Sequence, residues 1–488
     1  MKLFLFMLVF VVALGACGRG NNNGDNGGES TSPPQGMPPA VGGAGVEPLP
    51  EPAPIEPEGP AEIVYSPAYI FLRQLMSGDY LAAYEMMCDI TRAMLDIQTL
   101  AAIWQSVLVS QGHIVDFEMP APLVHDGLEI YDIVVTHTVG TGVHRVVVDD
   151  AGKIAGFTNQ GFALETIPPA ADALYYAEEI VIGAGTDWAL DGILTIPRDA
   201  DAANPVPAVV LVHGSGAQNM DSSIFDNRPF HDIATYLSSH GIAVVRYNKR
   251  TLTHGMRFAM ELGASGTVWE ETVEDAILAA DLLRADERID SDRIFVAGLS
   301  LGGMLAPRIH VSGGDFAGLI IMSASPRSFM DISISQNMMS LEMIEDEEIR
   351  AAMMMQVQAL AALYASVPYL EPEVAKTIPF AGGTTMYYLL DMERYPFAEV
   401  VAGIDVPILV LHGTHDFQTT AEEDFAAFES LFAVGCCDDI TLNLYDGLNH
   451  LLMPSIAAGI MDIFYDYAIP GHVDAQVLRD IVEWVEVR

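Results

Sequence analysis

A serine set among glycines is the residue in this sequence whose surroundings point most clearly to chemistry. Ser300 stands in GLSLGG, directly after the apolar run RIFVA. A G-x-S-x-G motif is typical of a sharp strand-to-helix turn that strains the serine backbone and exposes its hydroxyl as a nucleophile. Glycine is needed at Gly298 and Gly302, because a Cβ there would clash across the turn. Similar clusters also form ordinary turns, so the interpretation depends on the surrounding elements.

A serine nucleophile needs a general base and a carboxylate that orients the base. Asp416 ends the segment VPILVLHGTHD, and His450 lies in DGLNHLLM, just after the segment ITLNLYD. Both segments are predicted strands, so all three side chains follow the carboxyl end of a strand. The predicted triad is Ser300, Asp416 and His450, and the chemistry it indicates is acyl transfer.

Acyl transfer also needs backbone N–H groups that stabilise a tetrahedral oxyanion. Leu301, the residue after the nucleophile, supplies one of them. The small-residue loop HGSG follows the predicted strand VPAVVLVHG. We expect the second donor to be the N–H of Ser215, with Gly216 as the second choice. A simple glycine turn is the alternative interpretation of this loop.

Other titratable residues near these motifs offer competing roles. His412 and His415 form H-x-x-H-D with Asp416, a pattern that suggests a metal, but no distant third ligand is evident, and we predict no metal site and no cofactor. Asp446 is a second candidate for the acid, and we expect it to be a loop residue. His213 is expected to shape its loop rather than to act as a base.

The elements that must position these residues begin near residue 173. EEIVIGAG and LDGILTIP predict a hairpin, after which apolar strands and amphipathic helices alternate. This alternation predicts an α/β domain over residues 172–488, with a mostly parallel sheet covered by helices on both faces. Residues 326–396 interrupt the pattern with methionine-rich helices, which we interpret as a cap over the site, with ordinary helix packing as the alternative.

A smaller domain is predicted to precede this one, over residues 63–165. Residues 66–112 have helical spacing, whereas residues 113–156 alternate with a period of two and predict antiparallel strands. This order predicts a small α+β domain.

The amino-terminal residues are predicted to be a targeting signal and a tether. The apolar run LFLFMLVFVVAL is too short to span a bilayer as a mature helix, and it leads to LGAC. Residues 1–17 resemble a bacterial lipoprotein signal, which implies a lipidated Cys17 and an extracytoplasmic protein anchored to the bacterial cell membrane. A plain secretory signal is the alternative. Residues 18–62, rich in Gly, Asn, Pro and Glu, predict a disordered linker.

The formal net charge of −44, from 66 acidic and 22 basic residues, excludes nucleic acid as an expected partner. Adaptation to a salty or alkaline exterior and a compositional habit of the source genome explain this charge equally well. Only four cysteines are present, and we expect no disulfide scaffold.

Several motifs together resemble those of a known family. HGSG, GIAVVRYNKRT, AGLSLGGMLAPRI, PILVLHGTHDFQ and GLNHLLM are similar to segments of bacterial α/β-hydrolases that carry an amino-terminal domain of the DUF3887 type. The resemblance covers most of residues 66–488 and implies an α/β-hydrolase fold with serine esterase chemistry at Ser300, Asp416 and His450. Asn248 stands where the family often has Asp, and the loop after HGSG also departs from the family pattern.

The sequence therefore predicts a serine hydrolase that cleaves small-molecule carboxylic esters through an acyl-enzyme. A peptidase or thioesterase on the same triad is one alternative, because fold and triad do not fix the acyl group. A surface binding lipoprotein with a vestigial hydrolase domain is another. The membrane is expected as a partner only through the lipid anchor, and the sequence gives no indication of oligomeric state.

Overall fold

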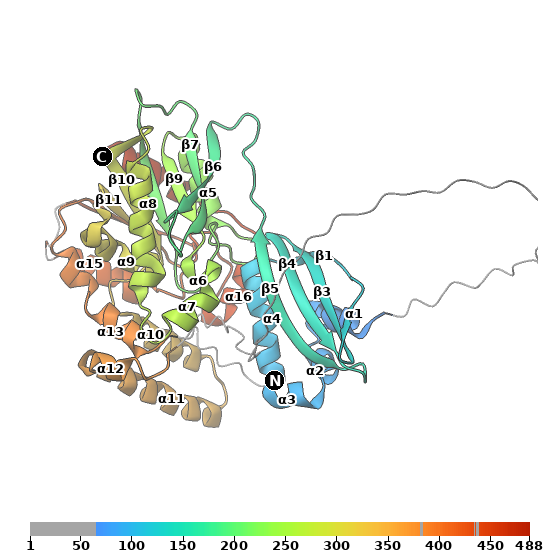
Figure 1. Cartoon of the computed structure of the whole chain (residues 1–488). Coiled ribbons are helices and arrows are strands. Elements are labelled where there is room, and N and C mark those ends of the chain that lie inside the picture. Colours follow the sequence, from blue (N-terminus) through green and yellow to red (C-terminus); the bar gives the residue numbers. More distant parts are fainter. Residues whose placement is uncertain (1–64, 381–383, 434, 436–438) are drawn as a thin grey trace, which may run out of the picture.

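The computed structural model describes residues 65–380, 384–433, 435 and 439–488. The predicted signal, Cys17 and the whole predicted linker, residues 18–62, lie outside these residues, as do Cys436 and Cys437. Two β-sheets organise the described chain. The first lies within residues 114–164 and the second within residues 175–445, and Figure 1 shows them side by side.

The smaller sheet has five antiparallel strands in the order β1-β3-β4-β5, with β2 also paired to β3. Burial alternates along β3 and β4, as expected for a sheet with one face against a core and one face in solvent. Phe71, Leu72 and Trp104 pack helices against the buried face. The elements are α1 (Pro67–Ser77), α2 (Tyr80–Glu85), α3 (Asp89–Met94), α4 (Ile97–Gln111), β1 (Ile114–Glu118), β2 (Leu123–His125), β3 (Leu128–His137), β4 (Gly140–Val148) and β5 (Ile154–Leu164).

The larger sheet has eight strands in the order β13-β12-β11-β10-β8-β9-β7-β6. Strands from β8 to β13 pair in parallel, whereas β6 and β7 form the predicted antiparallel hairpin at one edge. Because β10 is central, its carboxyl end lies at the middle of one edge of the sheet. The strands are β6 (Tyr175–Ile182), β7 (Leu190–Pro197), β8 (Val206–Val212), β9 (Ala243–Tyr247), β10 (Ile289–Leu299), β11 (Gly318–Met322), β12 (Ile408–Gly413) and β13 (Ile440–Tyr445).

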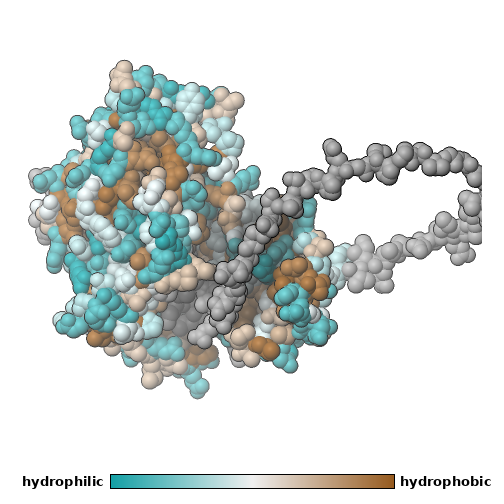
Figure 2. Space-filling view, viewed as in Figure 1, coloured by the Kyte–Doolittle hydropathy of each residue, from teal (hydrophilic) through white to brown (hydrophobic). Residues whose placement is uncertain are grey.

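Helices cover both faces of this sheet, which explains why its inner strands, such as β8, β11 and β12, are apolar along nearly their whole length. Val296 of β10 joins one core with helices α8 and α9, whereas its neighbours Phe295 and Ala297 join the opposite core with α5 and α17. Hydrophilic side chains cover much of the face in Figure 2. The covering helices include α5 (Pro229–Ser239), α6 (Arg250–Thr253), α7 (Gly255–Glu261), α8 (Glu274–Arg284), α9 (Leu301–Ile309), α15 (Ala426–Ala433), α16 (Ile463–Tyr467) and α17 (Ala475–Glu486).

Between β11 and β12 the chain forms a group of helices, where the sequence predicts a cap. Ser328 and Asp346 cap the two longest of them through hydrogen bonds to backbone N–H groups. Figure 1 places the group below the sheet, with α11 outermost. The helices are α10 (Phe329–Glu342), α11 (Glu347–Ser366), α12 (Pro372–Ala375), α13 (Met386–Glu393) and α14 (Phe397–Val401).

The small domain contacts the loop that leads from β8 to α5. The Phe225 N–H donates to the Val109 carbonyl over 2.8 Å, and Arg228 Nη1 donates to the Glu165 carbonyl over 2.8 Å. His113 Nδ1 lies 3.3 Å from the Asp226 carboxylate. The same loop begins with His213–Gly216, so one connection joins the predicted oxyanion loop to the small domain.

Candidate active site

Ser300 lies between the end of β10 and the start of α9, with φ of 56° and ψ of −119°. A positive φ is costly for a residue with a side chain, so the surroundings must impose it. A Cβ on Gly298 would collide with the backbone of Gly302, and one on Gly302 would collide with the carbonyl of Val212. The glycines thus allow a tight strand-to-helix turn, and the turn projects the serine from the sheet edge.

Asp416 and His450 meet at the same edge of the sheet, although 34 positions separate them. Asp416 follows β12 and His450 follows β13, so parallel neighbours bring their loops together. His450 Nδ1 lies 2.7 Å from Asp416 Oδ2, and both residues are buried. Because an ionised carboxylate only accepts hydrogen bonds, Nδ1 carries a proton and leaves Nε2 free to accept one.

The surroundings of Asp416 keep its carboxylate ionised. Burial is the largest single influence and by itself would raise the pKa of Asp416, but His450, His412 and the Thr419 N–H together outweigh it and lower that pKa. The N–H groups of Gln418 and Thr419 donate to Oδ1 over 2.9 and 3.0 Å, and the Thr419 hydroxyl donates to Oδ2 over 2.8 Å. The carboxylate is therefore held in place to orient the imidazole.

The loop that carries His450 is fixed by its neighbour Asn449. The side-chain oxygen of Asn449 accepts the N–H groups of Leu451 and Met453, and its amide donates to Asp466 over 2.7 Å. These bonds hold the loop in one conformation. The DGLNHLLM motif therefore positions the imidazole as well as supplying it.

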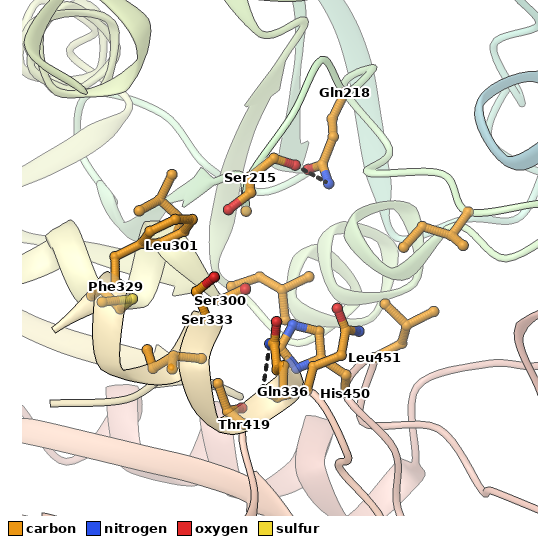
Figure 3. A pocket seen from close by; sticks show the side chains of 16 residues that line it. Ser215, Gln218, Ser300, Leu301, Phe329, Ser333, Gln336, Thr419, His450 and Leu451 are labelled. Carbon is orange, nitrogen blue, oxygen red and sulfur yellow. Dashed lines mark hydrogen bonds between the residues drawn. The ribbon is translucent and has the colours of Figure 1, made fainter. Parts of the chain in front are cut away.

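Ser300 and His450 line one cavity of about 820 Å³, including its open mouth (Figure 3). Within the part of the chain that the structure describes, no direct hydrogen bond joins the side chains of Ser300 and His450. Such bonds are often long before a substrate is bound. Apolar and neutral polar side chains make up the rest of the lining, which consists of Gly214, Ser215, Gln218, Ile224, Leu299, Leu301, Met304, Phe329, Ile332, Ser333, Gln336, Gln418, Thr419 and Leu451.

The predicted oxyanion donors border this cavity. Leu301 is the first residue of α9, where a backbone N–H has no acceptor within its own helix. Ser215 lines the same cavity as Leu301 (Figure 3). Gly216 has φ of 85° and is not among the lining residues described. The geometry therefore favours Ser215 over Gly216.

Helix α10 supplies a wall of the cavity that sequence reasoning did not assign to particular residues. Phe329, Ile332, Ser333 and Gln336 recur at helical spacing and face inward. Gln336 Nε2 donates to the Gln418 carbonyl over 2.7 Å, so the cap contacts the loop that holds the acid. The spacing of three and four positions in the sequence indicates that these residues share one face of a helix. It does not indicate which face of the helix meets the site.

The competing residues have other contacts, although His412 Nε2 also lies 3.9 Å from Asp416 Oδ2. His412 is buried, with Nε2 2.8 Å from the Thr419 carbonyl, and Asp446 is exposed and accepts from the Thr414 hydroxyl over 3.2 Å. His213 Nε2 contacts the Asn219 carbonyl, and burial lowers the pKa of His213 to about 3, so this residue is neutral. Among the described residues, no group of three or more His, Cys, Asp or Glu is placed to hold a metal ion.

A fold of this type, with a strained serine at a strand-to-helix turn, defines a class of hydrolases. Residues 209–455 match the model of the alpha/beta hydrolase family, and this chain belongs to that family. Its sequence is 30% identical over 425 residues to esterase EstD of Thermotoga maritima, covering 86% of this chain and 94% of that protein. The predicted α/β-hydrolase fold is confirmed, and the chain is a hydrolase.

Solved structures also superpose on parts of this chain, with lower similarity. A puromycin hydrolase superposes with a TM-score of 0.42 and 15% identity, over 76% of this chain and 47% of that chain. An acylaminoacyl peptidase of Pyrococcus horikoshii gives a TM-score of 0.42 and 10% identity, over 77% of this chain and 56% of that chain. The chain thus spans about half the length of these two proteins.

Proposed function

We propose that this protein hydrolyses carboxylic esters through an acyl-enzyme on Ser300. The observation that supports this most is the hydrogen bond between buried Asp416 and His450, because His450 lines the same cavity as the strained Ser300. The similarity to an esterase over most of both chains favours an ester over other acyl compounds.

The reaction has two acyl transfers. His450 Nε2 takes the hydroxyl proton while Ser300 Oγ bonds to the ester carbonyl carbon, and the carbonyl oxygen becomes an oxyanion facing the N–H groups of Leu301 and Ser215. The C–O bond to the alcohol then breaks, and His450 returns the proton to the leaving alcohol. Water repeats the sequence on the acyl-enzyme and releases the acid. Asp416 stabilises the imidazolium in both halves.

The cavity favours neutral substrates of medium size. Apart from His450, its described lining contains no Asp, Glu, Lys, Arg or other His side chain. An anionic acyl group would lose its hydration without gaining a partner, and a peptide amino terminus would find no carboxylate to pair with. Leu299, Met304, Phe329 and Ile332 offer apolar surface for an acyl or alcohol chain. These features favour an esterase over an exopeptidase.

Steady-state turnover tests this proposal. We expect p-nitrophenyl esters of short and medium acyl chains to be cleaved and the matched p-nitroanilides to be cleaved much more slowly. Ser300→Ala should abolish nearly all turnover. Ser239→Ala is the control, because Ser239 lies on α5 and donates to the Thr235 carbonyl rather than lining the cavity. Equal rates for the wild type and Ser300→Ala would overturn the proposal, and faster anilide cleavage would favour a peptidase.

The lipoprotein assignment is part of the same proposal. We infer from LGAC that Cys17 is lipidated and that residues 18–62 tether the enzyme outside the cytoplasmic membrane of a bacterium. The small α+β domain is assigned to the DUF3887 type on its sequence resemblance. Membrane fractionation of the full chain and of Cys17→Ser tests the anchor. An unchanged membrane-bound fraction in the variant would contradict it.

A further inference from the structure

Lys249 is a buried amine next to the proposed oxyanion loop. It follows β9, and only 2% of its side chain is exposed. Its Nζ lies 2.7 Å from the Gly214 carbonyl oxygen and 2.8 Å from Glu271 Oε1. Burying an ammonium is costly unless its protons are satisfied. The geometry therefore commits Lys249 to one backbone carbonyl and one carboxylate.

A second buried group holds Glu271. The Tyr388 hydroxyl donates to Glu271 Oε2 over 2.5 Å. Burial, together with the Glu271 charge, raises the pKa of Tyr388 well above its ordinary value, so the hydroxyl keeps its proton. Glu271 lies in a π-helical turn, Trp269–Val273, and Tyr388 lies on α13. A chain of hydrogen bonds thus runs from α13 to the Gly214 carbonyl.

The carbonyl that Lys249 contacts belongs to the same peptide unit as the Ser215 N–H. The described chain has no cis peptide bonds, so this C=O and N–H point in opposite directions. The N–H therefore points away from the ammonium. Gly214 itself packs on the nucleophile, since a Cβ there would lie 3.2 Å from Ser300 Cβ. Ser215 borders the cavity with Ser300 (Figure 3).

Lys249 also holds the far end of this loop. Its backbone N–H donates to the Gln218 carbonyl over 3.0 Å, and Gln218 Nε2 donates to the Ser215 carbonyl over 3.3 Å. The loop is thus bound to one residue at both ends. A cation that donates to a peptide carbonyl also draws electron density from the N–H of that peptide and makes it a stronger donor.

We propose that Lys249 is a positioning residue for acyl transfer, which orients and polarises the Gly214–Ser215 peptide so that the Ser215 N–H stabilises the oxyanion. This inference rests on the proposed function. Glu271 and Tyr388 hold the ammonium against the carbonyl. Because the N–H bonds most strongly to a full negative charge, the effect is greatest at the tetrahedral stage rather than on the bound ester.

The test compares the wild type with Lys249→Met. Loss of one oxyanion donor costs about 10²–10³ in kcat, so we expect a fall approaching about 100-fold with little change in KM. The affinity for a trifluoromethyl ketone, which binds serine as a tetrahedral oxyanion, should fall by a similar factor. A merely structural role would change the folded fraction and KM. The fall in kcat would then not match the fall in affinity for the ketone.

Two further variants guard against misfolding. Lys249→Met/Glu271→Gln removes both charges, so no carboxylate is left buried and unpaired. Arg308→Met/Asp391→Asn removes another buried ion pair, in which Arg308 Nη1 lies 2.7 Å from Asp391 Oδ2. This pair lies outside the loop that carries Gly214 and Ser215. We expect the first double variant to keep the catalytic defect at a normal folded fraction, and the second to keep activity.

The outcomes separate this inference from the proposed function. Wild-type turnover that depends on Ser300, together with undiminished kcat and ketone affinity in both Lys249 variants, would overturn the role of Lys249 alone. Wild-type turnover that does not depend on Ser300 would overturn the proposed function and this inference with it. A matched loss of kcat and ketone affinity in a folded variant would support both.

Discussion

His450 Nδ1 lies 2.7 Å from Asp416 Oδ2, and this contact determines which ring nitrogen is available to Ser300. The buried carboxylate has four hydrogen-bond donors, three of them from Gln418 and Thr419. It is therefore already oriented before a substrate arrives. The contact gives Asp416 a role in selecting the imidazole tautomer and in stabilising the imidazolium, without itself taking up the proton.

Replacing Asp416 with Asn tests that role. An Asn amide can donate to Nδ1 and so favour the tautomer with the proton on Nε2, which cannot accept the Ser300 proton. We expect kcat on a p-nitrophenyl ester to fall by about 10³–10⁴ with a small change in KM. The control is Asp446→Asn, because Asp446 is exposed and contacts Thr414. A large loss in Asp446→Asn with activity retained in Asp416→Asn would assign the acid to Asp446.

The elbow glycines give a second prediction. A Cβ on Gly302 would collide with the carbonyl of Val212, so Gly302→Ala must displace α9 or β8. We expect a lower melting temperature and a fall in kcat of about 100-fold or more, because small displacements of a nucleophile are costly. Gly459→Ala should be neutral, since its φ is 179° and nothing lies within 4 Å of the added Cβ. Thermal melting and steady-state kinetics measure both, and a fully active Gly302→Ala would contradict the account of the turn.

The cap wall gives a prediction about substrate size. Ile332 of α10 lines the cavity, so Ile332→Trp should occupy space that a longer acyl chain needs. We expect kcat/KM to fall more for octanoyl than for acetyl esters, so that the octanoyl-to-acetyl ratio of kcat/KM falls by about tenfold or more. Met338→Trp, on the same helix with the native side chain 37% exposed, is the control. A uniform loss at every acyl length would show that Ile332 does not border the chain-binding space.

The small domain gives a prediction about pH. Burial lowers the pKa of His144 from its ordinary 6.5 to about 4, with His137 adding to the effect. The unfolded chain therefore binds a proton that the folded chain does not bind between these values. The stability due to neutral His144 is complete above pH 6.5 and is lost as the pH falls towards about 4.

Denaturant unfolding at neutral and mildly acidic pH measures this effect. His144→Phe retains a ring where His144 stacks on Phe157. Between neutral pH and about pH 5, the free energy of unfolding should fall less in this variant than in the wild type, by up to about 2 kcal/mol. His125→Phe is the control, because the His125 side chain is 73% exposed. Equal acid sensitivity in the wild type and His144→Phe would show that this histidine does not contribute.

The parallel sheet and the order of Ser300, Asp416 and His450 follow from local patterns. Apolar runs such as RIFVA and PILVLHG report burial on both faces, and parallel strands bring their carboxyl ends to one edge. Residues at those ends can therefore be predicted to meet without knowledge of the side-chain geometry. In the structure Asp416 contacts His450, and His450 lines one cavity with Ser300.

Contacts set by packing between distant elements could not be predicted in the same way. Lys249 and Glu271 lie 22 positions apart in elements whose separation depends on how α8 meets the sheet. Tyr388 reaches Glu271 from α13, and no spacing in the sequence indicates it. For Asn248, the sequence shows a departure from the family pattern but not the contact that this residue makes. Its side-chain oxygen accepts the Met220 N–H over 2.9 Å, a contact that an aspartate could also make.

The measurement that tests the central claim most directly is the site and rate of fluorophosphonate labelling, read by mass spectrometry of the digested protein. We predict a single adduct on Ser300 in the wild type, no adduct in Ser300→Ala, and labelling slowed by about 10²-fold or more in His450→Ala. An adduct on another serine, or labelling of Ser300 at an undiminished rate without His450, would contradict the assignment of Ser300 as a nucleophile activated by His450.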